Sequence, residues 1–293
     1  PVTDITITTA TSGGNITSNG GAEIIAKGVC WSTTVNPSIT DDKTIDGVGI
    51  AQFVSNLSGL TAGMTYYARA YATNSAGTAY GISWSFTTYN SDAIPDIDGN
   101  YYNIVTIGTQ TWLAKDLITT RYRNGDPIET TTYGKDISGE ATPKYQWAPE
   151  DAETHIPAYG RLYTWYAVTD IRNVCPTRSH VPTAKEWQTL SNYCGGDGVA
   201  GGELKKKGTD YWREPNRGAK DTYGFSALAT GARPYDGKEL YIPGTTSGHW
   251  WGIDMDAGTH YNRYITSDDI YLGWDFQGVL FYYALAVRCL RDN

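Results

Sequence analysis

The sequence predicts an all-β sandwich in residues 1–88, followed by a larger α+β domain in residues 96–293. Three observations support this division. Short apolar runs bounded by Thr, Ser and Gly occur throughout residues 1–88, a pattern typical of β-strands. Helix-start signals appear among strand-like segments in residues 96–293. Residues 89–95 contain Asn, Ser, Asp and Pro between these parts, so we interpret them as a linker.

The composition indicates a folded, aromatic-rich chain. Of its 293 residues, 40% are hydrophobic and 18% are charged, which leaves enough apolar material for packed cores. The 33 Gly, 23 Tyr and 10 Trp favour a turn-rich protein that recognises a ligand. The net charge of −8 argues against nucleic acid as a partner. The sequence has no run of about 18 apolar residues, so we expect no transmembrane segment.

The clearest strand signal of the first part lies in residues 60–74, where the alternation from Tyr66 to Ala72 predicts two faces. We expect one face in the core (Tyr66, Ala68, Ala70, Ala72) and the other in solvent (Tyr67, Arg69, Tyr71). Leu60 lies six residues before Tyr66, a spacing that resembles the tyrosine corner of fibronectin type III sandwiches. This part has no catalytic constellation, and we interpret it as a spacer.

The second part begins with a predicted hairpin at residues 101–113. A helix is predicted over residues 160–168, where large apolar side chains recur at helical spacing. Another helix is predicted to begin at Thr183, with Glu186 completing a capping box that contributes about 1 kcal/mol. Beyond Gly195 the Gly-rich sequence predicts short strands and turns.

Several distinctive motifs occur in order along this second part. They are Ile-Gly-Thr-Gln-Thr-Trp-Leu-Ala (107–114), Gly-Arg-Leu-Tyr-Thr-Trp (160–165), Cys-Pro (175–176), His-Val-Pro-Thr-Ala-Lys-Glu-Trp (180–187), Gly-Phe-Ser-Ala-Leu (224–228) and Ala-Val-Arg-Cys-Leu-Arg-Asp (286–292). Together these motifs resemble the Fibrobacter succinogenes major paralogous domain (FISUMP). The resemblance implies a C-type-lectin-like fold. The first part is similar to the immunoglobulin-like or fibronectin III-like modules that precede such domains. A secreted or lipid-anchored position at the bacterial outer surface is also implied.

The resemblance further implies a disulfide between Cys175 and Cys289, because both cysteines fall in family motifs. A bridge that closes about 114 residues contributes roughly 4–5 kcal/mol in the chain-entropy model. We expect Cys30 and Cys194 to be buried free thiols.

The ligand-binding face is predicted in residues 245–285, where Tyr, Trp, Asp, His, Ser and Gly are concentrated. Rigid aromatic side chains with small polar neighbours are typical of antibody-like binding surfaces. The predicted ligand-binding residues are Trp250, Asp254, Asp256, His260, Tyr264, Asp269, Tyr271, Trp274, Phe276 and Tyr282. We expect Trp251, Tyr261 and Arg263 to be structural. The segment also resembles the variable proteins of diversity-generating retroelements, in which template adenines are mutated.

The sequence argues against catalysis and leaves calcium as an alternative. The Val-Pro-Thr-x-x-Glu-Trp motif also resembles formylglycine-generating proteins, but these need a reactive cysteine pair where this chain has only Cys289. Glu214-Pro215-Asn216 matches a mannose-binding tripeptide of calcium-dependent lectins, although Trp-Asn-Asp does not follow it. We assign no metal site and no required cofactor.

Taken together, these patterns predict a non-enzymatic surface protein that displays a ligand-binding face. Its partner would be a protein or glycan on another cell, a phage or a host surface. The alternatives are a calcium-dependent carbohydrate-binding module, an adhesin or pilus-like structural subunit, and a degenerate enzyme of the formylglycine-generating type.

Overall fold

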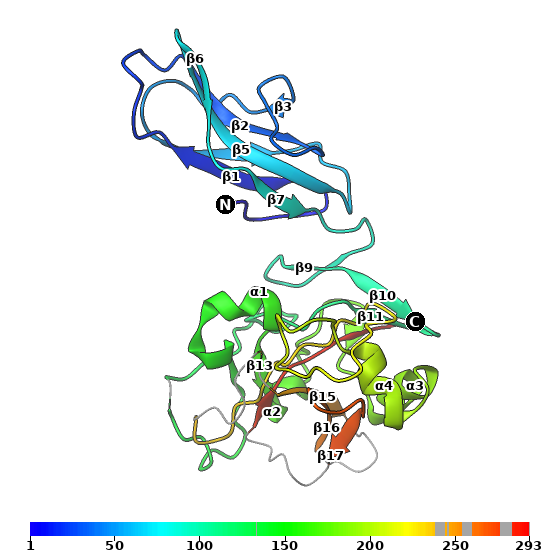
Figure 1. Cartoon of the computed structure of the whole chain (residues 1–293). Coiled ribbons are helices and arrows are strands. Elements are labelled where there is room, and N and C mark those ends of the chain that lie inside the picture. The colour runs from blue at the N-terminus through cyan, green and yellow to red at the C-terminus, as the bar shows by residue number, and fades with distance from the viewer. Residues whose placement is uncertain (133, 238–243, 245, 254–259, 276–282, 293) are drawn as a thin grey trace. The chain divides into compact units, whose positions relative to one another are not determined.

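The computed structural model describes the chain except residues 133, 238–243, 245, 254–259, 276–282 and 293 (Figure 1). Two compact units divide the chain, Pro1–Ala93 and Ile94–Asn293. The boundary falls inside the segment that the sequence predicts as a linker. Most of the regular structure is β-strand. None of the helices in the described ranges is long and apolar enough to cross a bilayer.

The first unit is a β-sandwich. One sheet pairs β1 (Ala10–Asn15) with β4 (Gln52–Leu57). The other sheet has the order β3 (Asp42–Lys43), β2 (Ala26–Ser32), β5 (Thr65–Asn74) and β6 (Gly77–Tyr80), and β7 (Trp84–Thr87) also pairs with β5. Phe53 and Leu57 of the first sheet pack with Val29, Trp31 and Phe86 of the second, so the core lies between the sheets.

The tyrosine corner is confirmed. The backbone N–H of Thr61 donates to the Tyr66 hydroxyl at 2.9 Å, and both Leu60 and Tyr66 are buried. The expectation that Tyr71 faces solvent is wrong. Its ring is buried on the opposite face of β5, and its hydroxyl donates to the carbonyl of Thr44 at 2.7 Å. The chain after β3 covers that face, which the alternation in β5 alone does not reveal.

The described residues of the second unit form four small sheets. They are β8 (Ile94–Pro95) with β9 (Tyr101–Tyr102); β10 (Ile104–Ile107), β11 (Gln110–Leu113), β19 (Leu290–Arg291) and β14 (Ser179–His180); β12 (Gln146–Trp147), β13 (Leu162–Thr164) and β18 (Ala284–Leu285); and β15 (Ser247–Ile253), β16 (His260–Thr266) and β17 (Gly273–Asp275). The strand β19 near the C-terminus therefore lies beside β11, the second strand of the predicted hairpin (Figure 1). This pairing closes the unit.

The helices of this unit are short. They are α1 (Ile156–Tyr159), α2 (Trp165–Val168), α3 (Ala184–Tyr193) and α4 (Asp197–Leu204), with 3₁₀ turns η1 (Pro149–Asp151) and η2 (Glu153–His155). The capping box at α3 is confirmed, since Thr183 and Glu186 each accept a hydrogen bond from the other's backbone N–H. The predicted helix over 160–168 is wrong for Leu162–Thr164. These residues form β13, because pairing with β12 and β18 overrides their helical spacing.

The sequence does not predict the helix α4, because its glycines disfavour helix formation. Close packing explains why glycine occurs at these positions. A Cβ at Gly201 would collide with the carbonyl of Tyr271, and one at Gly202 would lie 2.8 Å from the carbonyl oxygen of Gly218. The helix therefore depends on contacts with the loops that lie against it.

The core of the second unit is rich in tryptophan, and a disulfide crosses it. Trp112 and Trp187 have ring centroids 4.9 Å apart and are fully buried. Cys175 and Cys289 are joined, which is the pairing that the family resemblance implies, and Cys30 and Cys194 are buried free thiols as expected. The bridge fixes the chain before β14 to the chain before β19.

Candidate functional site

The sheet β15–β17 is anchored from inside the unit by a buried arginine. Arg263 of β16 has no exposed surface. Its guanidinium donates to Asp197 Oδ1 at 2.9 Å, to Gln188 Oε1 at 3.1 Å and to the Leu272 carbonyl at 3.3 Å. Because Gln188 lies in α3 and Asp197 begins α4, these bonds fix the inner face of the sheet on both helices.

Aromatic side chains lie near β17, the last strand of this sheet. Trp274 is 47% exposed and Tyr271 is 36% exposed. Tyr264 is half-buried and lies opposite Gly273, where any Cβ would collide with its ring. Its ring also stacks on His249, with centroids 5.9 Å apart and an interplanar angle of 29°. An aromatic group held by such contacts can bind a ligand at little cost in side-chain entropy.

These aromatic groups do not form one flat surface. In the register of the sheet, Tyr264 pairs with Gly273 and Arg263 pairs with Trp274. Because successive side chains of a strand point to opposite faces, Tyr264 and Trp274 lie on opposite faces of the sheet. A ligand that contacts both would have to reach around β17.

The assignment of Trp250 to the binding face is wrong. Trp250 is fully buried, and its indole Nε1 donates to Asp116 Oδ1 at 2.9 Å. It pairs with Arg263 across β15 and β16, so alternation places it on the inner face. Trp251, Tyr261 and Arg263 are buried, in agreement with the structural roles expected for them.

The remaining predicted residues are placed only in part. Asp269 lies in an exposed turn, and its Oδ1 accepts the backbone N–H groups of Ile270 and Tyr271 at 2.6 Å and 3.3 Å. His260 begins β16, but its side chain lies outside the described part of the structure. Four further predicted residues lie outside the described ranges: Asp254, Asp256, Phe276 and Tyr282.

The stacked pair of His249 and Tyr264 is uncharged at neutral pH. Burial lowers the pKa of His249 to about 4, so its imidazole is neutral. Burial also raises the pKa of Tyr264, so its phenol keeps its proton. The two stacked rings therefore carry no charge themselves, although the carboxylates of Asp269 and Asp275 are close enough to act on Tyr264.

The calcium alternative receives no support from the described residues. Within them, no group of three His, Cys, Asp or Glu side chains is close enough to hold a metal ion. The amide of Asn216, the last residue of the lectin-like tripeptide, is buried and donates to the carbonyls of Lys206 at 3.0 Å and Gly208 at 2.6 Å. Asn216 therefore supports a loop from inside.

The cysteines offer no exposed thiol for chemistry. Cys289 is in the disulfide, and burial raises the pKa of the Cys194 thiol to about 12. Cys30 is also buried, and its pKa is raised mainly by burial. A thiol with a raised pKa is a poor nucleophile and a poor metal ligand, because both roles need the thiolate.

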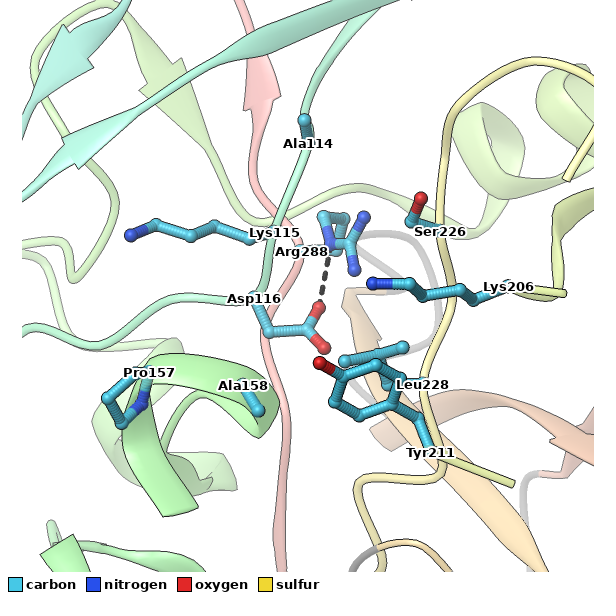
Figure 2. Close-up of a pocket in the computed structure, with 10 residues that line it drawn as sticks. All are labelled: Ala114, Lys115, Asp116, Pro157, Ala158, Lys206, Tyr211, Ser226, Leu228 and Arg288. Carbon is cyan, nitrogen blue, oxygen red and sulfur yellow. Dashed lines mark hydrogen bonds and ion pairs between the residues drawn. The ribbon is translucent and has the colours of Figure 1, made fainter. Parts of the chain in front are cut away.

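A cavity that the sequence does not predict lies between the chain after β11, α1, the segment 206–228 and the chain before β19 (Figure 2). Its volume is about 240 Å³. Asp116 and Arg288 line it, and each side chain is 1% exposed. Arg288 Nε donates to Asp116 Oδ1 at 2.7 Å, while its Nη1 donates to the Phe225 carbonyl at 2.6 Å. The same Asp116 oxygen accepts Trp250 Nε1, which connects the cavity wall to β15.

A signal for this cavity was present in the sequence. Asp116 lies between Leu113 and Leu117, and Arg288 lies in the motif Ala-Val-Arg-Cys-Leu at 286–290. Charged residues in apolar runs are rarely buried unless they are paired. The sequence does not show which charge pairs with which, because 172 residues separate these two.

A second hollow of about 370 Å³ lies near η1 and β12. Arg161 lines it and donates to Gln146 Oε1 at 2.9 Å and to Glu153 Oε2 at 2.6 Å. Asp151 accepts from Arg233, which is 2% exposed. The charged groups at this hollow are thus already paired within the protein.

Comparison with known families identifies the family of the second unit. The model of the Fibrobacter succinogenes major domain (Fib_succ_major) matches residues 105–291, more than half of the chain. No curated protein matches the chain.

Proposed function

Because this chain belongs to the Fibrobacter succinogenes major domain family, we propose that it is a non-enzymatic ligand-binding protein displayed on a bacterial surface. The observation that carries this proposal is the set of aromatic side chains around β17, on a sheet anchored by Arg263. Trp274 and Tyr271 are exposed, although many side chains of the neighbouring strands β15 and β16 are buried. Exposed aromatic groups on a rigid support are the usual source of binding energy at recognition surfaces.

The proposal extends to the architecture. We infer that residues 94–293 have a C-type-lectin-like fold, and that the preceding sandwich is a fibronectin III-like spacer. The tyrosine corner at Tyr66 supports the second inference. A secreted or lipid-anchored position would bring the binding face into contact with a protein or glycan on another cell, a phage or a host.

The origin of the binding face is a further part of the proposal. The residues around β17 include Tyr, Asp, Ile and Gly, which are outcomes of adenine mutagenesis by diversity-generating retroelements. In that case a near-copy of the coding segment, differing at adenines, would lie close to a reverse transcriptase gene. Sequencing of the surrounding DNA would reject this origin if neither is present.

Binding to a glycan and surface-protein array tests the proposed function. We compare the full chain with the triple variant Tyr264→Ala, Tyr271→Ala and Trp274→Ala. Each aromatic anchor typically contributes about 2 kcal/mol, so the triple variant should lose its specific binding. The matched control is Trp84→Ala, because Trp84 of β7 is also 47% exposed but belongs to the spacer.

Circular dichroism would establish that each variant folds. Binding that survives in the triple variant, or that is lost in the Trp84 variant, would refute the assignment of the site to β15–β17. A requirement for calcium would favour a carbohydrate-binding module, and self-association without any ligand would favour a structural subunit.

A further inference from the structure

The cavity of Figure 2 has the size of a site for a small molecule. Its volume of about 240 Å³ is several times the roughly 30 Å³ that one water occupies in the liquid. It is smaller than the roughly 300–1,000 Å³ of sites for drug-sized ligands. Part of its wall is apolar, formed by Ala158 and Leu228 among others. Such a wall suits the carbon skeleton of an organic ligand better than a bare inorganic ion.

The charges in the cavity favour an anion. Figure 2 shows the Lys206 ammonium pointing toward Asp116 and Arg288, whereas the Lys115 ammonium points away. Lys206 lies 4.3 Å from the ring centroid of Tyr211 and forms no ion pair with a described residue. Asp116 neutralises Arg288, so the positive charge of Lys206 remains without a counterion at the cavity.

The carboxylate of Asp116 adds a second requirement for a ligand of this cavity. Its Oδ1 accepts two hydrogen bonds, from Trp250 and Arg288, but its buried Oδ2 has no partner among the described residues. A buried acceptor without a donor costs about 1–3 kcal/mol. Figure 2 shows the carboxylate directed into the cavity, on the side of the Tyr211 ring. A ligand that donates to Oδ2 would remove this cost, while an anion with acceptors alone would be repelled.

From these contacts we propose that the cavity binds a small organic acid that has a hydroxyl or ammonium group beside its carboxylate. The ligand carboxylate pairs with Lys206, and the neighbouring donor bonds to Asp116 Oδ2. A free hydroxy acid, an amino acid and a uronic acid all share this chemistry. The site is separate from the aromatic groups around β17, so its test does not depend on the proposed recognition surface.

Titration calorimetry with the full chain tests the proposal. The probes are glycolate, glycine and D-glucuronate, with acetate and glycerol as compounds that lack one of the two groups. We expect at least one of the first three to bind, and acetate and glycerol to bind at least about tenfold more weakly. The probe that binds best distinguishes a hydroxy acid, an amino acid and a uronic acid.

The variant Lys206→Met removes the cation but keeps a similar side-chain length, and it should weaken binding by about tenfold or more. Lys207→Met is the matched control, because Lys207 is exposed and does not line the cavity. Asp116 is not substituted here, since it also pairs with Arg288 and Trp250 inside the core. The proposal is overturned if no probe binds at about 10 mM, if acetate binds as tightly as the others, or if Lys206→Met binds unchanged.

Discussion

The interior of residues 1–93 is made mainly of apolar side chains, whereas the interior of residues 94–293 also contains many buried charges. In the first unit, which the structure describes completely, one Lys or Arg is buried: Lys27, whose ammonium donates to the Gly49 carbonyl at 3.3 Å. In the second unit the buried cations include Arg161, Lys205, Arg233, Arg263 and Arg288.

The buried cations of the second unit join segments that are far apart in the chain. Arg288 pairs with Asp116 and Arg263 pairs with Asp197, across 172 and 66 residues. Lys205 donates to the carbonyls of Thr266 at 2.9 Å and Asp269 at 2.7 Å, and burial lowers its pKa to about 8. The first unit obtains its geometry from two paired sheets. The second has short strands and long loops, so we infer that its buried charges fix where the loops lie.

The largest loss of stability is expected when one partner of a buried ion pair is removed. In Arg288→Met the carboxylate of Asp116 stays buried without its counterion, which should destabilise the second unit by about 3–5 kcal/mol. Scanning calorimetry of the full chain measures this as a lower transition temperature for that unit. In the double variant Arg288→Met and Asp116→Leu both charges are absent, and most of the loss should be recovered. Equal losses in the single and double variants would show that packing, not charge, explains the effect.

A smaller effect is expected in the sandwich. Tyr66→Phe removes the hydroxyl that accepts from Thr61 and leaves the ring in the core, so it should cost about 1 kcal/mol. The control is Tyr67→Phe, on the other face of β5, where a change near zero is expected. Urea unfolding measures both. If the two variants lose the same stability, the corner hydrogen bond contributes nothing specific.

An effect of similar size concerns pH. The hydrogen bond to Glu186, opposed by burial and supported by Asp292, raises the pKa of His180 from 6.5 to about 8. Because the folded state binds this proton more tightly, the stabilisation is complete below pH 6.5 and is lost as the pH rises through about 8. Since 33% of the side chain is exposed, we expect an effect on the order of 1 kcal/mol after screening by solvent.

The urea midpoint of the second unit at about pH 6 and about pH 9 measures this effect. His180→Gln should remove the difference between the two values. A difference that persists in this variant would assign the pH dependence to other groups. His249 acts in the opposite direction: because its pKa is lowered to about 4, its contribution is complete above pH 6.5 and declines as the pH falls toward 4.

Much of the local structure could be predicted from the sequence, because its causes are local. The capping box at Thr183 and Glu186 and the tyrosine corner at Tyr66 each depend on residues a few positions apart. The hairpin predicted over 101–113 does so as well, but it forms only at 104–113, since Tyr101–Tyr102 pair with β8. Their hydrogen bonds need only the neighbouring backbone. The composition of residues 245–285 predicts a binding face there, and Tyr271 and Trp274 within this segment are exposed.

The tertiary structure alone decided which of these residues are accessible and which charges meet. Trp250 is of a residue type that is common at binding surfaces. The pairing of β15 with β16 nevertheless places it on the inner face, against Asp116. Leu162–Thr164 has helical spacing but pairs as a strand. The cavity between Asp116, Lys206 and Arg288 exists because segments from the beginning, middle and end of the unit come together. Sequence patterns record local spacing, whereas burial and long-range pairing are set by the packing of the whole unit.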